Sequence, residues 1–228
     1  MKFIIIGLGN FGSSIAQKLT NTGHEVIGVD SKMSKVESLK ETITHTICLD
    51  STDIQAVKHL PLKDTDVVMV SIGEDEGASI LTTALMKQLK VKRLISRAVS
   101  PLHEMILEAM KIEEIIHPEE ETAERWAKKF NISGVIDSFD LSADHHIIEA
   151  KVPKQFVNKT IGEIGVRKNY NVIVLTTIKP TTEKNLLGVP KKVNKVQEVG
   201  NSKTILDEND VMVLYGKMND IKHFLKED

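Results

Sequence analysis

A glycine pattern near the start of the chain constrains its fold more than any other feature. Gly7, Gly9 and Gly12 have the spacing G-x-G-x-x-G, directly after the apolar run 2–6 and directly before a stretch of helical periodicity. The first glycine permits a tight turn, the second lets the backbone approach a pyrophosphate, and the third lets the helix pack against the strand. The helix N-terminus then faces the anion. The pattern therefore predicts a phosphate loop, made of Gly7, Leu8, Gly9, Asn10, Phe11 and Gly12.

The first half of the chain alternates short apolar runs with helical patterns, which is typical of βαβ units and a parallel sheet. Most of the runs are apolar throughout, as expected of strands that helices cover on both faces. Strands are predicted at 2–6, 25–30, 45–50, 66–71, 93–97 and 114–117. One helix is predicted to begin at Ser34, which has the capping-box spacing to Glu37. The other predicted helices are 13–20, 77–89, 102–110 and 118–130.

The pattern changes after Asn131, where Ile132, Ser133 and Gly134 are interpreted as a hinge. A Lys-rich hairpin and loop is predicted at 179–203. The other expected elements are strands at 146–152, 171–178, 193–199 and 210–215, and helices at 160–167 and 219–225. The sequence thus predicts an α/β protein with two domains. A Rossmann-like, doubly wound parallel sheet occupies residues 1–130, including the crossover helix, and a smaller α+β C-terminal domain occupies 131–228.

Composition and charge narrow the classes of partner. The 228 residues carry a net charge of −2, so no basic excess favours a nucleic-acid partner. The single cysteine, Cys48, rules out an internal disulfide and is expected to be a small core residue, because it lies in an apolar run. No apolar segment reaches the length of a signal peptide or the roughly 20 residues that cross a bilayer. We therefore expect a cytosolic protein that reaches a membrane only through a partner.

Acidic residues at the ends of predicted strands indicate how a nucleotide would be held. Asp30 ends the second strand, where it can accept hydrogen bonds from ribose hydroxyls. Its charge repels a 2′-phosphate, so a ligand with a free ribose is expected. Asp50 ends the third strand, and it either accepts from an adenine amino group or caps the next helix, as its neighbours also could. Ser31 and Ser51, which follow the two aspartates, are included in the candidate site.

The fourth and fifth predicted strands end on the same edge of the sheet. Ser71, Ile72 and Gly73 lie at the end of the fourth strand and are assigned to the cleft. Arg97 ends the fifth strand, and its guanidinium either meets a phosphate or carboxylate or is a solvated surface group. Residues 119–121 are glutamates in the first turn of a predicted helix, where the helix dipole alone favours them. Alternatively, one or more of them holds a hard cation with oxygen ligands from elsewhere, such as another subunit.

No catalytic constellation accompanies these residues. The sequence has no HExxH motif, no paired cysteines and no Ser-His-Asp arrangement, and no Lys or Tyr stands out as a hydride-transfer acid. His145 and His146 are adjacent in a strand-like stretch, so their side chains would point to opposite faces, and a metal site is not expected there. A non-enzymatic role is favoured, and an NAD-dependent oxidoreductase that uses the same cleft is the alternative.

Five motifs, taken together, closely resemble the Trk and Ktr family of potassium-uptake regulatory subunits. They are GLGNFG from Gly7, the strand that ends in Asp30, CLDSTD from Cys48, SIGEDEGASILTTALMKQL from Ser71 and IIHPEEE from Ile115. The resemblance implies an N-terminal RCK (KTN) domain and a C-terminal RCK domain. It also implies homodimers that assemble into a tetrameric or octameric ring beneath a membrane potassium-translocating subunit, at the inner face of the cell membrane.

The resemblance further implies ligands and their sites. ATP, ADP or NAD(H) in the cleft would change the ring and so the channel, without turnover. A divalent cation near the nucleotide would be held by the glutamate that follows His-Pro, which here is Glu119. Some relatives bind cyclic di-AMP between C-terminal domains, and the stretch 161–170 matches that region loosely, with Arg167 as the candidate residue.

Two positions depart from the family pattern. Ktr-type relatives often have arginine, which meets a terminal phosphate, where this chain has Asn10. An amide brings donors without charge, so the preference among ATP, ADP and NAD is open. Asp50 stands where some relatives have asparagine, which leaves an acceptor and removes a donor.

Overall fold

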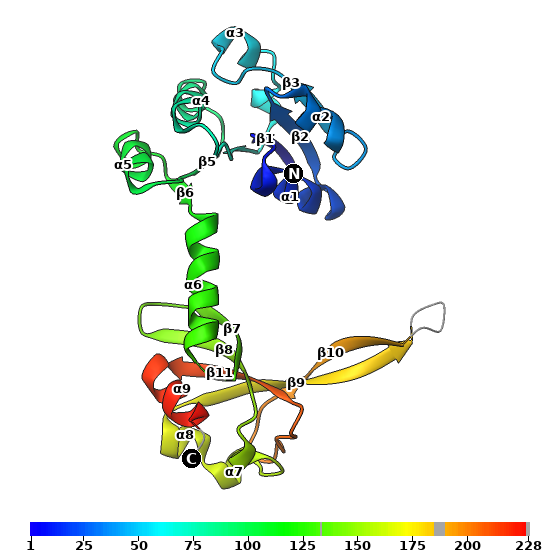
Figure 1. The fold of residues 1–228 in the computed structure, drawn as a ribbon, viewed down its shortest axis with the longest axis vertical. Helices are drawn as coiled ribbons and strands as arrows, with labels where there is room; N and C mark the ends of the chain where they lie inside the picture. The colour runs from blue at the N-terminus through cyan, green and yellow to red at the C-terminus, as the bar shows by residue number, and fades with distance from the viewer. Residues whose placement is uncertain (133, 185–189, 227–228) are drawn as a thin grey trace. The chain divides into compact units, whose positions relative to one another are not determined.

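A computed structural model describes residues 1–132, 134–184 and 190–226 of the chain (Figure 1). The chain divides into two compact units, Met1–Glu120 and Glu121–Asp228. The division falls inside helix α6 (Pro118–Asn131), whereas the sequence-based boundary after residue 130 assigns that helix to the first domain. Ser133 of the predicted hinge lies outside the described residues.

The first unit contains a six-stranded parallel sheet in the order β3-β2-β1-β4-β5-β6. At its centre, Ile6 of β1 pairs with Val29 of β2 and with Val70 of β4, which run to either side. The order reverses between β1 and β4, and open α/β sheets bind ligands at such a switch point. This sheet confirms the predicted doubly wound fold, and its strands are β1 (Lys2–Ile6), β2 (Glu25–Asp30), β3 (His45–Cys48), β4 (Val67–Val70), β5 (Leu94–Arg97) and β6 (Glu114–Ile116).

Helices cover both faces of this sheet. Ile5 packs with Ala16 of α1 (Asn10–Asn21) and Val36 of α2 (Met33–Leu39) on one face. Ile4 and Ile6 pack on the other face with residues from α3 (Ile54–Val57) and α4 (Glu76–Gln88). Burial on both faces explains why the strand sequences are continuously apolar. The remaining elements of the unit are η1 (Leu62–Asp64) and α5 (Pro101–Ala109).

Two helix starts differ from the sequence-based expectation. Helix α1 begins at Asn10 and not at Ser13, because Gly9 is its extended N-cap and accepts from the Ser13 N–H at 2.9 Å. Helix α2 has Lys32 as its N-cap, so the predicted capping box at Ser34 is wrong. The Asp30 carboxylate accepts from the Lys32 N–H at 2.9 Å, which starts the helix before Ser34 is reached.

Cys48 is exposed, so the expectation of a core residue is wrong. It ends β3, one of the two edge strands of the sheet, and its Sγ lies 3.5 Å from the Ser31 carbonyl oxygen. Among the described residues no helix has the length and apolarity needed to cross a membrane.

The second unit is built on a five-stranded antiparallel sheet in the order β10-β9-β11-β8-β7, which confirms the predicted α+β part. Its core contains Ile148, Leu214 and Phe224, each fully buried. The strands are β7 (Val135–Asp140), β8 (His145–Lys151), β9 (Ile173–Lys184), β10 (Pro190–Val199) and β11 (Val211–Lys217). The helical segments besides α6 are η2 (Lys154–Phe156), α7 (Ile161–Ile164), α8 (Val166–Tyr170) and α9 (Met218–Leu225).

Sequence reasoning underestimated the strands of this unit. The Lys-rich span 179–203 was expected to be partly loop, but its residues 179–184 and 190–199 belong to the long antiparallel strands β9 and β10 (Figure 1). Residues 185–189 of the predicted loop lie outside the described residues. The helix expected at 160–167 is two short helices, because Gly165 has a left-handed backbone with φ of 65°. His146 of β8 is buried and its Nδ1 lies 2.6 Å from Asp140, whereas His145 stacks on Tyr215. The two histidines therefore do not share a site.

Candidate functional site

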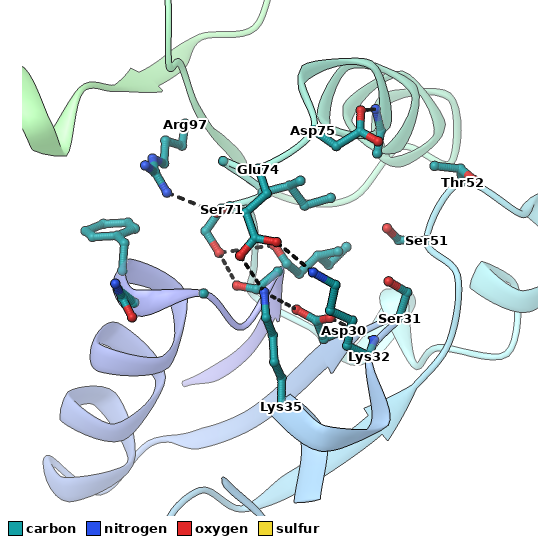
Figure 2. Close-up of a pocket in the computed structure, with 18 of the residues that line it drawn as sticks. Asp30, Ser31, Lys32, Lys35, Ser51, Thr52, Ser71, Glu74, Asp75 and Arg97 are labelled. Carbon is teal, nitrogen blue, oxygen red and sulfur yellow. Dashed lines mark hydrogen bonds and ion pairs between the residues drawn. The ribbon is translucent and has the colours of Figure 1, made fainter. Parts of the chain in front are cut away.

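A cleft of about 530 Å³ lies at the carboxyl edge of the parallel sheet (Figure 2). Segments that follow β1, β2, β3 and β4 line it, together with the end of β5 and the start of α6. Open α/β sheets bind ligands at this edge. The structure brings together here these residues of the sequence-predicted site: Gly7, Gly9, Asn10, Phe11, Asp30, Ser31, Asp50, Ser51, Ser71, Ile72, Gly73, Arg97 and Glu119.

The surroundings of the three loop glycines differ in how much room they leave for a side chain. Gly7 has φ of +97°, and a Cβ there would lie 2.8 Å from the Ile72 nitrogen. A Cβ on Gly12 would lie 1.9 Å from the Gly7 carbonyl oxygen, so this glycine lets α1 pack on the loop. A Cβ on Gly9 would meet nothing within 4 Å. The fold therefore requires Gly7 and Gly12, whereas the space beside Gly9 is open.

Two residues of the predicted loop do not line the cleft. Leu8 is 4% exposed and belongs to the hydrophobic core, and Gly12 is buried in α1. Both residues support the loop from the side that faces the protein core. The Leu8 backbone still contributes to the site, because its N–H donates to Asp30 Oδ2 at 2.8 Å and so connects the loop to the end of β2.

Asp30 forms part of the floor of the cleft and is 9% exposed. Its Oδ2 accepts from Leu8 and its Oδ1 accepts from the Lys32 N–H at 2.9 Å. Each carboxylate oxygen has more than one lone pair, so both can accept a further hydrogen bond from a ligand. The geometry is compatible with the predicted contact to ribose hydroxyls.

Asp50 does not cap the following helix, so that alternative is wrong. The N-cap of α3 is Asp53, whose side chain accepts from the Gln55 N–H at 2.8 Å. Asp50 instead accepts from the N–H of Thr52 at 2.9 Å and from its hydroxyl at 2.7 Å. These hydrogen bonds lower the pKa of Asp50 below its ordinary value, so a charged acceptor lines the cleft. Ser51 is buried, with its hydroxyl 2.9 Å from that of Thr82.

Arg97 is not a solvated surface group, because only 14% of its side chain is exposed. Its guanidinium pairs with Glu119, donates to the Ser71 carbonyl at 3.4 Å and lies 5.9 Å from the centre of the Phe11 ring. Its Nε is buried and has no hydrogen-bond partner among the described residues. A Cβ on Gly73 would lie 2.6 Å from Arg97 Nη1, so a side chain at this position would displace the guanidinium. Arg97 therefore presents a fixed positive charge beside the phosphate loop.

Sequence reasoning missed a charged group on the other side of the cleft. Glu74 lies 2.8 Å from the Lys32 ammonium and 3.0 Å from that of Lys35, and Lys35 lies 3.9 Å from Asp30 Oδ2 (Figure 2). The two lysines lower the pKa of Glu74 to about 2, and Glu74 raises the pKa of Lys32. Their position in the sequence could have assigned these residues to the cleft, because they closely follow Asp30 and Gly73 at strand ends. The cleft is also lined by Ile6, Thr52, Asp75 and Ala78.

Two residues were predicted to bind ligands other than the nucleotide, Glu119 a divalent cation and Arg167 cyclic di-AMP. Glu119 lies at the edge of the cleft, but the described part of the chain contains no group of three or more His, Cys, Asp or Glu residues that could hold a metal ion. Arg167 is exposed on α8 in the second unit and is not part of the cleft.

Sequence comparisons match this chain over almost its full length. The family model described as the TrkA-N domain matches residues 3–118. The Ktr system potassium uptake protein A of Bacillus subtilis is 31% identical over 226 residues, which cover 99% of this chain and 96% of that protein. The Ktr system potassium uptake protein C of the same organism is 30% identical over 225 residues, with the same coverage.

Solved structures show the same fold. The GsuK RCK domain matches with a TM-score of 0.66 at 16% identity, covering 99% of this chain and 48% of that one. A GsuK channel described as bound to NAD matches with a TM-score of 0.65, covering 99% of this chain and 39% of that one. On these sequence matches, the chain belongs to the Trk and Ktr family of potassium uptake proteins and carries a TrkA-N domain.

Proposed function

We propose that this chain is a nucleotide-binding regulatory subunit of a potassium uptake system. It would act in the cytoplasm, at the inner face of the cell membrane, and control a membrane potassium-translocating subunit. The observation that carries the proposal is the cleft, in which the phosphate loop, Asp30 and Arg97 converge. The relatives that the chain matches along its length are named as potassium uptake proteins, which supports the biological setting.

The proposed ligand is an adenine nucleotide, either ATP, ADP or NAD(H). Gly9 would let its phosphates reach the N-terminus of α1, where backbone N–H groups and the helix dipole favour an anion. Asp30 would accept from the ribose hydroxyls. The Arg97 guanidinium lines the cleft and is a donor that suits a phosphate oxygen. One solved structure with this fold is described as bound to NAD, which agrees with this ligand class.

The proposed mechanism needs no turnover. A nucleotide can shift a homodimer or a ring between two arrangements only as far as it binds one of them more tightly than the other. We include in this proposal a homodimer that assembles into a tetrameric or octameric ring. The change in the ring would be transmitted to the membrane subunit.

A divalent cation at Glu119 would need help from the ligand. Glu119 is 65% exposed at its side chain and is engaged by Arg97. A hard cation prefers six or more oxygen ligands, so phosphate oxygens or a second subunit would have to supply most of them. The loose match at 161–170 makes cyclic di-AMP a second proposed ligand, with Arg167 exposed and available to it.

Mass spectrometry of the nucleotide released from purified protein tests the binding proposal. We expect near-stoichiometric amounts of one adenine nucleotide, or calorimetric binding after it has been removed. Protein that carries no nucleotide and gives no binding heat with ATP, ADP, NAD or NADH would overturn the proposal.

Replacing Asn10 tests which phosphate the loop recognises. Asn10 is exposed and lines the cleft. Asn10→Arg should raise the affinity for ATP relative to ADP at least about tenfold, because a hydrogen bond to a charged group contributes about 1.5–3 kcal/mol. Calorimetric titration with both nucleotides measures the ratio, and Asn10→Gln, which lengthens the side chain without charge, is the matched control. An unchanged ratio in Asn10→Arg would remove position 10 from phosphate discrimination.

A further inference from the structure

The two sides of the cleft are joined by an ionic bridge at the end that Asp30 occupies. Lys32 and Lys35 come from the start of α2, and Glu74 comes from the segment between β4 and α4. Figure 2 shows the Glu74 carboxylate linked to both lysines. Lys35 also lies 3.9 Å from Asp30 Oδ2, so the bridge is next to the carboxylate that would meet a ribose. The bridge therefore stands where the substituents of a bound ribose would lie.

The charges of this group cancel. Asp30 and Glu74 supply two carboxylates, and Lys32 and Lys35 supply two ammonium groups. Without Glu74, two positive charges would face one buried aspartate. The sign of the potential at the ribose end thus depends on Glu74, a side chain that is 65% exposed and whose hydrogen bonds are made with the two lysines.

Nucleotide-binding folds of this type read the ribose 2′ position at the end of the second strand. An acidic residue there accepts from a free 2′-hydroxyl, whereas a nearby basic residue accommodates a 2′-phosphate. This cleft contains both, an aspartate and two lysines. The lysines hold the Glu74 oxygens at 2.8 and 3.0 Å, which are also the distances at which ammonium groups hold phosphate oxygens.

We propose that Glu74 is a specificity-determining residue that occupies the place of a ligand's 2′-phosphate and so restricts the cleft to nucleotides with a free ribose. This inference rests on the proposed nucleotide binding. Asp30 disfavours a 2′-phosphate, and Glu74 neutralises the two lysines that would otherwise attract one. Lys32 and Lys35 thus form a phosphate subsite that the Glu74 carboxylate occupies.

Glu74→Gln tests the inference, because it keeps the shape of the side chain and removes its charge. Two ligand pairs that differ only by the 2′-phosphate are titrated by calorimetry: AMP against adenosine 2′,5′-bisphosphate, and NAD against NADP. The unchanged protein should prefer the free-ribose member of each pair at least about tenfold. In Glu74→Gln this ratio should move toward the 2′-phosphate at least about tenfold, chiefly through tighter binding of the phosphorylated ligand.

Two controls distinguish the effect of breaking the ionic bridge from the effect of changing the net charge of the protein. Glu37→Gln removes the same charge from α2, where Glu37 pairs with Lys40 outside the cleft, and should leave the ratio unchanged. Adding Lys32→Ala and Lys35→Ala to Glu74→Gln should abolish the gain in affinity for the 2′-phosphate. An equal shift in Glu37→Gln, or a gain that survives loss of both lysines, would overturn the role of Glu74.

The remaining outcomes distinguish this inference from the proposal on which it rests. If the unchanged protein binds neither these four ligands nor ATP, ADP or NADH, the proposed nucleotide binding fails. If it binds ATP, ADP or NADH but none of the four ligands, only the inference about the ribose 2′ position fails. If it binds the free-ribose ligands but Glu74→Gln leaves the ratio where it was, only the inference fails. An unchanged protein that prefers the 2′-phosphorylated ligands would likewise overturn it.

Discussion

Gly12→Ala is expected to destabilise the first unit by about 3 kcal/mol, the upper end of the usual cost of overpacking. The new Cβ would lie 1.9 Å from the Gly7 carbonyl oxygen and 2.6 Å from Ser71 Oγ. The first of these atoms belongs to the backbone, so the loop and α1 must move apart. At roughly 2–4 °C per kcal/mol, the melting temperature should fall by about 6–12 °C in a thermal unfolding experiment.

Helix propensity alone predicts the opposite sign for this substitution. Alanine is favoured over glycine inside a helix by about 1 kcal/mol, and Gly12 lies within α1. A melting temperature that stays the same or rises would therefore show that helix and loop do not touch at Gly12 as the structure has them.

Gly9→Ala should leave the fold intact and weaken nucleotide binding about a hundredfold. The added methyl group meets no protein atom within 4 Å, and the backbone at Gly9, with φ of −72°, suits any residue. The same methyl would stand between the N-terminus of α1 and the phosphates. Loss of one or two charge-assisted hydrogen bonds, at about 1.5–3 kcal/mol each, accounts for a factor of this size.

Calorimetry with the nucleotide that the unchanged protein retains measures this effect, and thermal unfolding provides its control. The stability cost should remain below about 1 kcal/mol, which is the preference of an N-cap position for glycine over alanine. Unchanged affinity in a folded Gly9→Ala protein would mean that the phosphates do not approach this loop. Gly9 and Gly12 thus form a matched pair, in which one added methyl group acts on the ligand and the other on the fold.

Much of the first unit follows from its sequence, because its strands are buried on both faces. Such strands have no polar alternation and can be recognised as continuous apolar runs, as in β1 and β2, whose observed bounds match the predicted ones. Residues at strand ends then fall on one edge of the sheet, which is why the predicted residues of the cleft lie together. Cys48 was misjudged because the edge position of β3 depends on strand order, which local sequence does not reveal.

Contacts between distant segments could not be predicted in this way. Lys32 and Glu74 are 42 residues apart, and no local pattern pairs them. Asp53, rather than Asp50, caps α3, because the choice among several competent neighbours depends on the path of the loop. The strands of the second unit were underestimated because β10 carries several lysines, which resemble a loop until the antiparallel pairing with β9 is known.

The central claim is that a nucleotide in this cleft controls potassium uptake, and uptake by living cells tests it most directly. In the native host, the chromosomal copy is replaced by Gly9→Ala, and the initial rate of potassium uptake is compared with that of unchanged cells and of cells lacking the chain. Immunoblotting confirms equal amounts of protein. The account predicts that the variant, although folded, no longer supports the regulated uptake of unchanged cells. Uptake identical to that of unchanged cells, by a variant that has lost its nucleotide, would contradict it.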